Sequence, residues 1–371
     1  MRRIARSIHN ISTPKQKHVD FGLLLVVGLL VVFGLVMVYD SSVVQAFKDF
    51  NNKYFYIRQQ LIWVVLGSGA LIFFSKFNFH YLKKLSLPFL IVAFLMLLAV
   101  FIPDLGVNAG GAHRWLKLGP VTVQPAEIIK LASIIFFAAL FEKKIKNGPF
   151  LLVVGAVSLI VGVLQKDLGS VVVYFLTALT MYIFAGARLK YTLGLVPFAA
   201  LAGIAFILSS TYRKQRVMAF LDPFSDPQGY TYHISQVLIA LGSGGFWGLG
   251  IGQSRQKFEY IPEVTTDSIF AIVGEELGFI GSAFLIGLFL VLLYKCSQIV
   301  EETSDGFGKL LAFGLTSWIA TQTVVNLAAM VSLIPLTGVP LPFISYGGSA
   351  LLVNLVAIGI LLNISRSKNV L

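Results

Sequence analysis

The sequence predicts an all-α integral membrane protein, with about ten transmembrane helices packed in one bundle. Hydrophobic residues make up 57% of the 371 residues and charged residues only 12%, whereas soluble domains contain about 25% charged residues. Apolar runs near the spanning length of about 20 residues also recur along the whole chain, with no polar block that would form a separate soluble domain. We therefore expect residues 1–371 to form a single membrane domain.

Ten apolar runs are candidate membrane spans. Several are shorter than a full span, so their helices are expected to include flanking residues. Only Gln165-Lys166-Asp167 separates the fifth run from the sixth, which indicates a tight turn. The runs cover residues 21–39, 61–74, 85–102, 125–140, 150–164, 168–185, 191–208, 268–293, 310–333 and 350–364.

The distribution of basic residues predicts the orientation. If the N-terminus is cytoplasmic and the spans alternate, seventeen lysines and arginines fall in cytoplasmic segments and six in short segments on the other side. Cytoplasmic loops are normally the more basic ones. The sequence therefore predicts a cytoplasmic tail at residues 1–20, a cytoplasmic C-terminus, and a large extracytoplasmic loop at residues 209–267 between the seventh and eighth spans.

Charge and cysteine content exclude several other classes. The net charge is +12, but the basic residues lie in short clusters between apolar runs, as topology signals do, so we expect contact with membrane lipids and no nucleic-acid partner. The single cysteine excludes an internal disulfide.

Two pairs of charged residues lie within predicted spans. Glu127 and Lys130 are one helical turn apart in the fourth span, and Glu275 and Glu276 lie in the eighth. Intramembrane charges usually face a bundle interior or a wet cavity. The first pair is either an ion pair that links helices or part of a functional site, whereas the second is interpreted as structural or cavity-lining.

Polar motifs concentrate in the segments predicted to be extracytoplasmic. The segment around Arg114 and Trp115 leads into Q-P-x-E-x-x-K at residues 124–130, and R-x-x-R-x-x-x-x-x-D-P spans residues 213–223. G-S-G-G follows at 242–245, G-E-E-L-G at 274–278 and P-L-P-F-I-S-Y-G-G-S at 340–349. In this order the motifs resemble the SEDS family (shape, elongation, division, sporulation), which includes FtsW, RodA and SpoVE, over nearly the whole chain. The 254–258 stretch and the C-terminal end look more like FtsW and SpoVE than RodA.

The resemblance implies an enzyme that polymerises lipid II into peptidoglycan glycan strands on the outer face of the cytoplasmic membrane, with inversion at the anomeric carbon and release of undecaprenyl pyrophosphate. It also implies a class B penicillin-binding protein as the transpeptidase partner, and divisome membrane proteins as further partners of a division-type member. An elongation or sporulation role is the alternative setting.

Asp267 matches the essential aspartate of the family's His-Thr-Asp motif and is the candidate general base. The sequence departs from the family around it, because Thr265-Thr266-Asp267-Ser268 stands where His-Thr-Asp-Phe is usual. For an aspartate at this position the alternative role is to cap the following helix.

The other candidate site residues are assigned to substrate binding. Arginines suit a pyrophosphate because their guanidinium binds two oxygens at once. Ser345 and Gly347 belong to a loop expected to line the wall of the site. A magnesium ion held by Asp167 and Asp267 is a possible cofactor, although no ligand spacing is diagnostic. The substrate-binding candidates are Arg114, Glu127, Lys130, Asp167, Arg213, Arg216, Ser345 and Gly347.

Two rival functions use the same residues. A lipid II flippase would also need intramembrane charges such as Glu127 and Lys130, but the polar residues gather on one face and no inverted repeat is evident. A scaffold that only recruits a transpeptidase would not require so many charges at the outer mouth.

Overall fold

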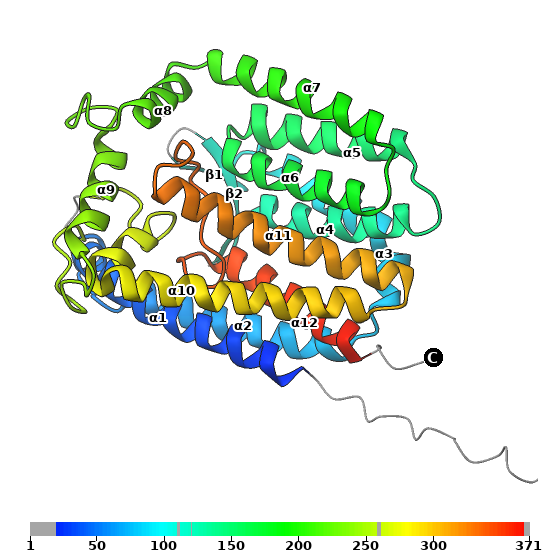
Figure 1. Ribbon diagram of the computed structural model, residues 1–371, viewed down its shortest axis with the longest axis horizontal. Coiled ribbons are helices and arrows are strands. Elements are labelled where there is room, and N and C mark those ends of the chain that lie inside the picture. The colour runs from blue at the N-terminus through cyan, green and yellow to red at the C-terminus, as the bar shows by residue number, and fades with distance from the viewer. Residues whose placement is uncertain (1–19, 110–111, 120, 258–260, 367–371) are drawn as a thin grey trace, which may run out of the picture.

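The computed structural model describes residues 20–109, 112–119, 121–257 and 261–366. The long helices run roughly along one direction and form a single bundle (Figure 1). The expected cytoplasmic tail lies outside these residues except for Asp20, whose carboxylate accepts a hydrogen bond from the Leu23 amide and caps the first helix.

Ten helical segments correspond to the ten predicted spans. Eight of the helices in the described ranges are long and apolar enough to cross a membrane, so the chain is an all-α multi-pass membrane protein. Helices α4 and α6 have 17 residues each and fall short of that length, so the count of ten stays a prediction. The segments are α1 (Phe21–Phe50), α2 (Phe55–Lys76), α3 (His80–Ala99), α4 (Pro125–Phe141), α5 (Asn147–Ser158) with the π-helical η1 (Leu159–Leu164), α6 (Leu168–Phe184), α7 (Leu189–Leu208), α10 (Ile269–Glu302), α11 (Gly306–Met330) and α12 (Gly348–Arg366).

Burial separates inner from outer helices. In the most apolar 18-residue window of each, 78% of α12 and 61% of α11 is buried inside the protein, against 17% of α2 and 6% of α7. Helices α11 and α12 therefore form the centre of the bundle. The outer helices keep apolar side chains exposed, as expected where lipid is the solvent.

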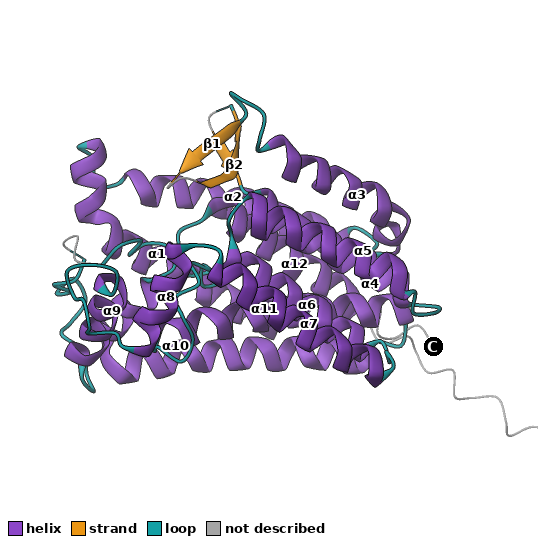
Figure 2. Cartoon of the chain, turned by 90° about the horizontal axis from the view of Figure 1, so that it is seen from above, coloured by secondary structure: helices purple, strands orange, loops and turns teal. Residues whose placement is uncertain are grey.

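The segment between α3 and α4 forms a small antiparallel sheet that the sequence analysis did not predict. Its strands are β1 (Gly106–Ala109), β2 (Ala112–Leu118) and β3 (Val121–Val123), in that order across the sheet. Figure 2 shows β1 and β2 standing off the helices next to α3. Strands of three to seven residues are too short to leave a clear alternating pattern in the sequence.

The predicted large loop at 209–267 is partly helical. It contains two helices, α8 (Thr211–Leu221) and α9 (Tyr232–Gly244), which lie at one end of the bundle, opposite the C-terminal end of α12 (Figure 1). The first helix is also longer than the predicted span at residues 21–39, because α1 continues from Tyr39 to Phe50. This polar extension is anchored through Asp40, which pairs with Lys257 at 2.9 Å.

Helix α10 is interrupted at Gly278, whose φ of 64° and ψ of −159° are not helical. The backbone groups freed by this break bond to residues 245–250: Leu249 and Gly250 donate to the carbonyls of Glu275 and Glu276, and Phe279 donates to Gly245. The break therefore ties the end of α9 to α10 and sets the direction in which α10 begins. Non-helical backbone of this kind is tolerated within a membrane protein only where such partners exist.

Gly278→Ala is expected to lower the free energy of unfolding by about 1–3 kcal/mol, because this backbone region is almost exclusive to glycine. A Cβ at this position would also lie 2.3 Å from the Gly248 nitrogen. Unfolding of the purified protein in detergent would measure the change. The matched control is Gly287→Ala on the same helix, where a Cβ would meet nothing within 4 Å; an equal loss in both variants would contradict the explanation.

Candidate functional site

Asp267 lies immediately before α10, in a segment held in place by its backbone. The amide of Asn326, on α11, donates to the Asp267 carbonyl at 2.8 Å and to the Val339 carbonyl at 2.8 Å. The Tyr346 amide donates to the Thr265 carbonyl at 2.8 Å. The loop between α11 and α12, residues 331–347, is thereby joined to the Asp267 segment from two sides.

The Asp267 carboxylate is buried, with 5% of the residue exposed. Burial raises the pKa of Asp267 to about 7, with a contribution from the negative charge of Glu263, while the positive charge of Arg216 opposes the shift. A Cβ placed on Gly338 would lie 3.8 Å from Oδ2 and would meet no other atom within 4 Å. A methyl-sized space therefore remains between Gly338 and the carboxylate, and the pKa of Asp267 suits a base that works near neutral pH.

The helix-capping alternative for Asp267 is wrong. The capping position of α10 is Ser268, and no side chain makes the capping hydrogen bond there. The Asp267 carboxylate is instead 3.4 Å from the Thr266 hydroxyl. Ser268 pairs with His233 of α9, with 2.7 Å between the Ser268 hydroxyl and the imidazole Nε2.

The two arginines of the R-x-x-R motif have different surroundings. Arg216 donates to the Leu336 carbonyl at 3.0 Å, lies over the Tyr212 ring, and is near enough to Asp267 to affect its pKa. Arg213 instead turns back onto α7, where it donates to the Phe206 carbonyl and stacks on the Phe206 ring. Of the two, the structure brings Arg216 to the Asp267 region.

A short stretch of the α11–α12 loop, residues 336–340, lies against Arg216, Gly169 and Asp267 and accepts hydrogen bonds from α11. Arg216 binds the Leu336 carbonyl, and Gly169 packs so closely that a Cβ would lie 2.2 Å from the Thr337 carbonyl oxygen. Gly338 faces Asp267, and the Val339 and Pro340 carbonyls accept from side chains of α11. We name residues 336–340 the hub segment.

Glu127 and Lys130 form an ion pair at 2.7 Å, one of the two alternatives for them, and both side chains are almost fully buried; their proposed role in substrate binding stays a prediction. Lys130 also donates to the Gln322 side chain on α11 at 3.1 Å and lies over the Trp318 ring. Gln322 in turn donates to the Pro340 carbonyl. The pair therefore links α4 to α11 and, through Gln322, to the hub segment.

Arg114 and Asp167 stabilise the tight turn between η1 and α6. Arg114, on β2, donates to the carbonyls of Gln165 and Lys166. Asp167 caps α6, because its two carboxylate oxygens accept from the amide and the hydroxyl of Ser170. These contacts place the turn, and with it Gly169, against the hub segment.

Ser345 and Gly347 make contacts within the wall of the site. The Ser345 hydroxyl accepts from the Leu341 amide at 2.8 Å. Gln60 of α2 donates to the Ser345 carbonyl and accepts from the Gly347 amide. Both residues shape the loop that joins the Asp267 segment.

Glu275 and Glu276 have the structural role expected from the sequence. They accept hydrogen bonds from the amides of Arg255 and Ser254, respectively, and Glu276 also pairs with Lys257 at 3.1 Å. Because Lys257 also binds Asp40, it is one of the basic residues engaged within the protein. The described part of Ser254-Arg255-Gln256-Lys257-Phe258 ends at Lys257.

No cluster of three or more His, Cys, Asp or Glu side chains able to hold a metal ion occurs among the described residues. Asp167, one of the two carboxylates considered for magnesium, already has both oxygens hydrogen-bonded. The charged side chains that shift the pKa of Asp267 are Glu263 and Arg216.

Sequence reasoning missed several residues of this site. Gln322 and Asn326 are four residues apart, hence on one face of α11, and two amides inside an apolar run were the signal that could have found them. His233 and Gly338 gave no comparable signal, because each becomes part of the site only through tertiary contacts.

Known proteins resemble this chain over almost its whole length. The FtsW/RodA/SpoVE family of cell cycle proteins matches residues 21–370. Stage V sporulation protein E of Bacillus subtilis (strain 168) is 39% identical over 95% of this chain and 99% of its own. The probable peptidoglycan glycosyltransferase FtsW of Geobacter sp. (strain M18) is 37% identical over 88% of this chain and 91% of its own.

Solved structures share the fold. A chain of a peptidoglycan synthase complex, described for its coordination of polymerization and crosslinking, superposes with a TM-score of 0.76 at 26% identity, covering 94% of this chain and 98% of the other. The rod shape determining protein RodA of Thermus thermophilus gives a TM-score of 0.68 at 25% identity, covering 94% and 97%. The chain belongs to the FtsW/RodA/SpoVE family.

Proposed function

We propose that this protein is a peptidoglycan glycosyltransferase that polymerises lipid II, with Asp267 as its general base. The observation that supports this best is the buried Asp267 carboxylate, which has a pKa near neutrality and free space beside Gly338. The FtsW relatives are named probable peptidoglycan glycosyltransferases, which agrees with this chemistry. Five motifs in family order support the same assignment.

In the proposed reaction, the 4-hydroxyl of an acceptor N-acetylglucosamine attacks the anomeric carbon of a donor N-acetylmuramic acid. Asp267 takes the hydroxyl proton while the new C–O bond forms. The bond between the anomeric carbon and the phosphate oxygen breaks, and undecaprenyl pyrophosphate leaves with the electron pair. A single displacement inverts the anomeric configuration. Arg216, whose positive charge reaches Asp267, is the cation proposed to offset charge on the pyrophosphate.

The setting of the reaction is part of the proposal. The excess of basic residues in alternate segments supports an extracytoplasmic site and cytoplasmic termini. The synthase complex among the structural neighbours supports a class B penicillin-binding protein as partner. Relatives named FtsW support a role in cell division with divisome proteins. Magnesium remains an expectation from the charge of the pyrophosphate.

The test is polymerisation of labelled lipid II by the purified protein in liposomes, with and without the cognate transpeptidase, analysed on gels. A ladder of glycan strands is expected. Folded protein that forms no ladder even with its partner, but moves lipid II between leaflets, would replace the enzyme with the flippase. Folded protein that does neither, yet binds the transpeptidase, would favour the scaffold.

The pH profile of polymerisation is expected to follow the ionisation of Asp267. A base must be deprotonated to act, so kcat/KM, which reports ionisations of the free enzyme, should fall about tenfold per pH unit below the Asp267 pKa of about 7 and level off above it. Glu263→Gln removes a negative charge that raises this pKa, so the acidic limb should move to lower pH. Glu301→Gln, on an exposed residue near the end of α10, is the control; a limb that stays in place in Glu263→Gln would contradict the assignment.

A further inference from the structure

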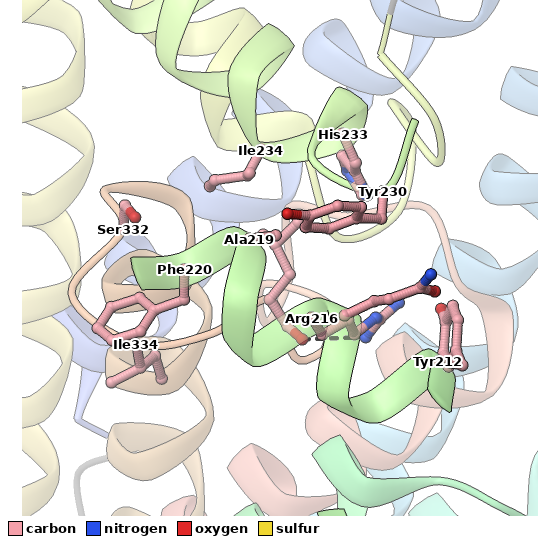
Figure 3. Close-up of a pocket in the computed structure, with 11 residues that line it drawn as sticks. Tyr212, Arg216, Ala219, Phe220, Tyr230, His233, Ile234, Ser332 and Ile334 are labelled. Carbon is pink, nitrogen blue, oxygen red and sulfur yellow. Dashed lines mark hydrogen bonds between the residues drawn. The ribbon is translucent and has the colours of Figure 1, made fainter. Parts of the chain in front are cut away.

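A cavity of about 140 Å³ lies between α8, α9 and the α11–α12 loop. Figure 3 shows Tyr212, Arg216, Tyr230 and His233 around it, with Phe220 and Ile334 on another side. His233 connects the cavity to Ser268, the residue after Asp267. The positive charge of Arg216 reaches both His233 and Asp267. A ligand in this cavity would therefore contact Arg216 and His233, the two side chains that connect the cavity to the Asp267 segment.

The size of the cavity limits its occupant. A cavity of about 150 Å³ accepts benzene, a single six-membered ring, whereas pockets for drug-sized ligands measure about 300–1,000 Å³. A space of about 140 Å³ therefore suits one six-membered ring with small substituents. A disaccharide or a prenyl tail is too large.

The charge of the lining excludes a pyrophosphate as the main occupant. Among the described residues that line the cavity, Arg216 is the one lysine or arginine, and it already donates to the Leu336 carbonyl. Burial, and to a lesser extent the charge of Arg216, lowers the pKa of His233 to about 4, so its imidazole is neutral at physiological pH. A buried multiple negative charge needs more cations than this.

An uncharged sugar ring fits the remaining chemistry. A pyranose presents hydroxyls at its edge and C–H groups on its faces. Tyr212, Gln215, Tyr230 and His233 can hydrogen-bond to hydroxyls, while apolar side chains such as Phe220 and Leu336 can cover a face. A neutral imidazole with one nitrogen bound to Ser268 keeps its other nitrogen for a sugar hydroxyl.

We propose that this cavity binds the N-acetylglucosamine ring of the acceptor lipid II and directs its 4-hydroxyl toward Asp267, with His233 as the residue that recognises its hydroxyls. The proposal rests on the polymerase function proposed above. N-acetylglucosamine is preferred over the other sugar of the substrate because N-acetylmuramic acid bears a lactyl group and a peptide, which exceed the space available.

Lipid I and lipid II provide matched probes, because lipid I lacks only the N-acetylglucosamine. The dissociation constant of each fluorescently labelled lipid is measured with the full chain in nanodiscs. The ratio of the two constants, lipid I over lipid II, reports how much the N-acetylglucosamine ring contributes to binding. His233→Leu is expected to lower the ratio about tenfold, the loss of roughly one hydrogen bond. His233→Gln, which can still donate and accept, should retain most of the ratio.

Ala219→Leu provides a second variant that leaves His233 intact. Ala219 lines the cavity, so a larger side chain should exclude the ring and lower the same ratio. Ser235→Ala is the control on α9, because the Ser235 hydroxyl bonds to the Tyr232 carbonyl within the helix. A merely structural defect would weaken binding of both lipids equally and leave the ratio unchanged.

The outcomes distinguish a failure of the sugar site from a failure of the proposed polymerase function. If the wild type polymerises lipid II but the ratio of dissociation constants is unchanged in both His233→Leu and Ala219→Leu, the sugar site is wrong and the polymerase function is retained. Equal weakening of both lipids would assign the cavity to the pyrophosphate or to structure and would also overturn the proposal. If the ratio of dissociation constants falls in the variants as expected but the wild type forms no polymer, the sugar site is supported and the proposed polymerase function is wrong.

Discussion

Asp267→Asn is expected to lower kcat for lipid II polymerisation by about 10²–10⁴-fold, the usual contribution of a general base. The amide has nearly the same shape as the carboxylate but cannot accept the proton of the attacking hydroxyl. The backbone contacts from Asn326 and Tyr346 do not involve the Asp267 side chain, so the fold should persist. Single-turnover polymerisation in liposomes would measure the loss.

The comparison with Thr266→Val makes this result specific. The Thr266 hydroxyl lies 3.4 Å from the Asp267 carboxylate, so its removal should change the rate much less than removal of the base. Lipid II binding by Asp267→Asn should stay close to that of the wild type, because the effect belongs to the chemical step. A ladder that persists at the wild-type rate in Asp267→Asn would remove Asp267 from the role of base while leaving the enzyme in place.

Lys130→Met is expected to lower the free energy of unfolding by about 3–5 kcal/mol, because it leaves the Glu127 carboxylate buried without its cation. Glu127 and Lys130 are 1% and 3% exposed, and the second oxygen of Glu127 is buried with no hydrogen-bond partner among the residues that the structure describes. Gln322 would lose the lysine as well. Thermal or SDS-induced unfolding of the purified protein would measure the change.

A surface pair provides the matched control. Lys83 pairs with Glu142, and their side chains are 38% and 18% exposed, so Lys83→Met should cost only about 0–1 kcal/mol. The double variant Glu127→Gln with Lys130→Met removes both charges together and should recover part of the loss. Equal losses in Lys130→Met and Lys83→Met would show that the buried pair does not have the structural role assigned to it.

The sequence predicted the spans well where apolar runs were long, because hydropathy is a local property that depends only on which residues are consecutive. It was less accurate at helix ends. Helix α1 continues to Phe50, and Asp40, which follows the apolar run, forms an ion pair with Lys257 far along the chain. A local hydropathy pattern does not contain this contact. The β1–β3 sheet was not predicted because its strands are short. Strands this short show no clear hydrophobic alternation, and nothing within one strand indicates its partner.

Within the candidate site, the sequence identified the chemical groups but not their arrangement. Asp267 and Arg216 could be named from motifs, and the structure brings them together. Arg213 could be named in the same way, yet it faces α7. Residues three apart lie on one face of a helix, so spacing alone does not distinguish the two arginines, and the neighbouring elements decide which of them meets the site.

The sequence by itself determined that this chain is a multi-pass membrane protein of the FtsW/RodA/SpoVE family, because composition, apolar runs and motif order are properties of the linear chain. Only the tertiary structure decided which residues lie against the hub segment, namely Arg216, Gly169, Asp267, Gln322 and Asn326. It also decided that His233 borders a cavity and bonds to Ser268, the residue after the proposed base. These contacts join residues far apart in sequence, so they exist only once the helices have packed.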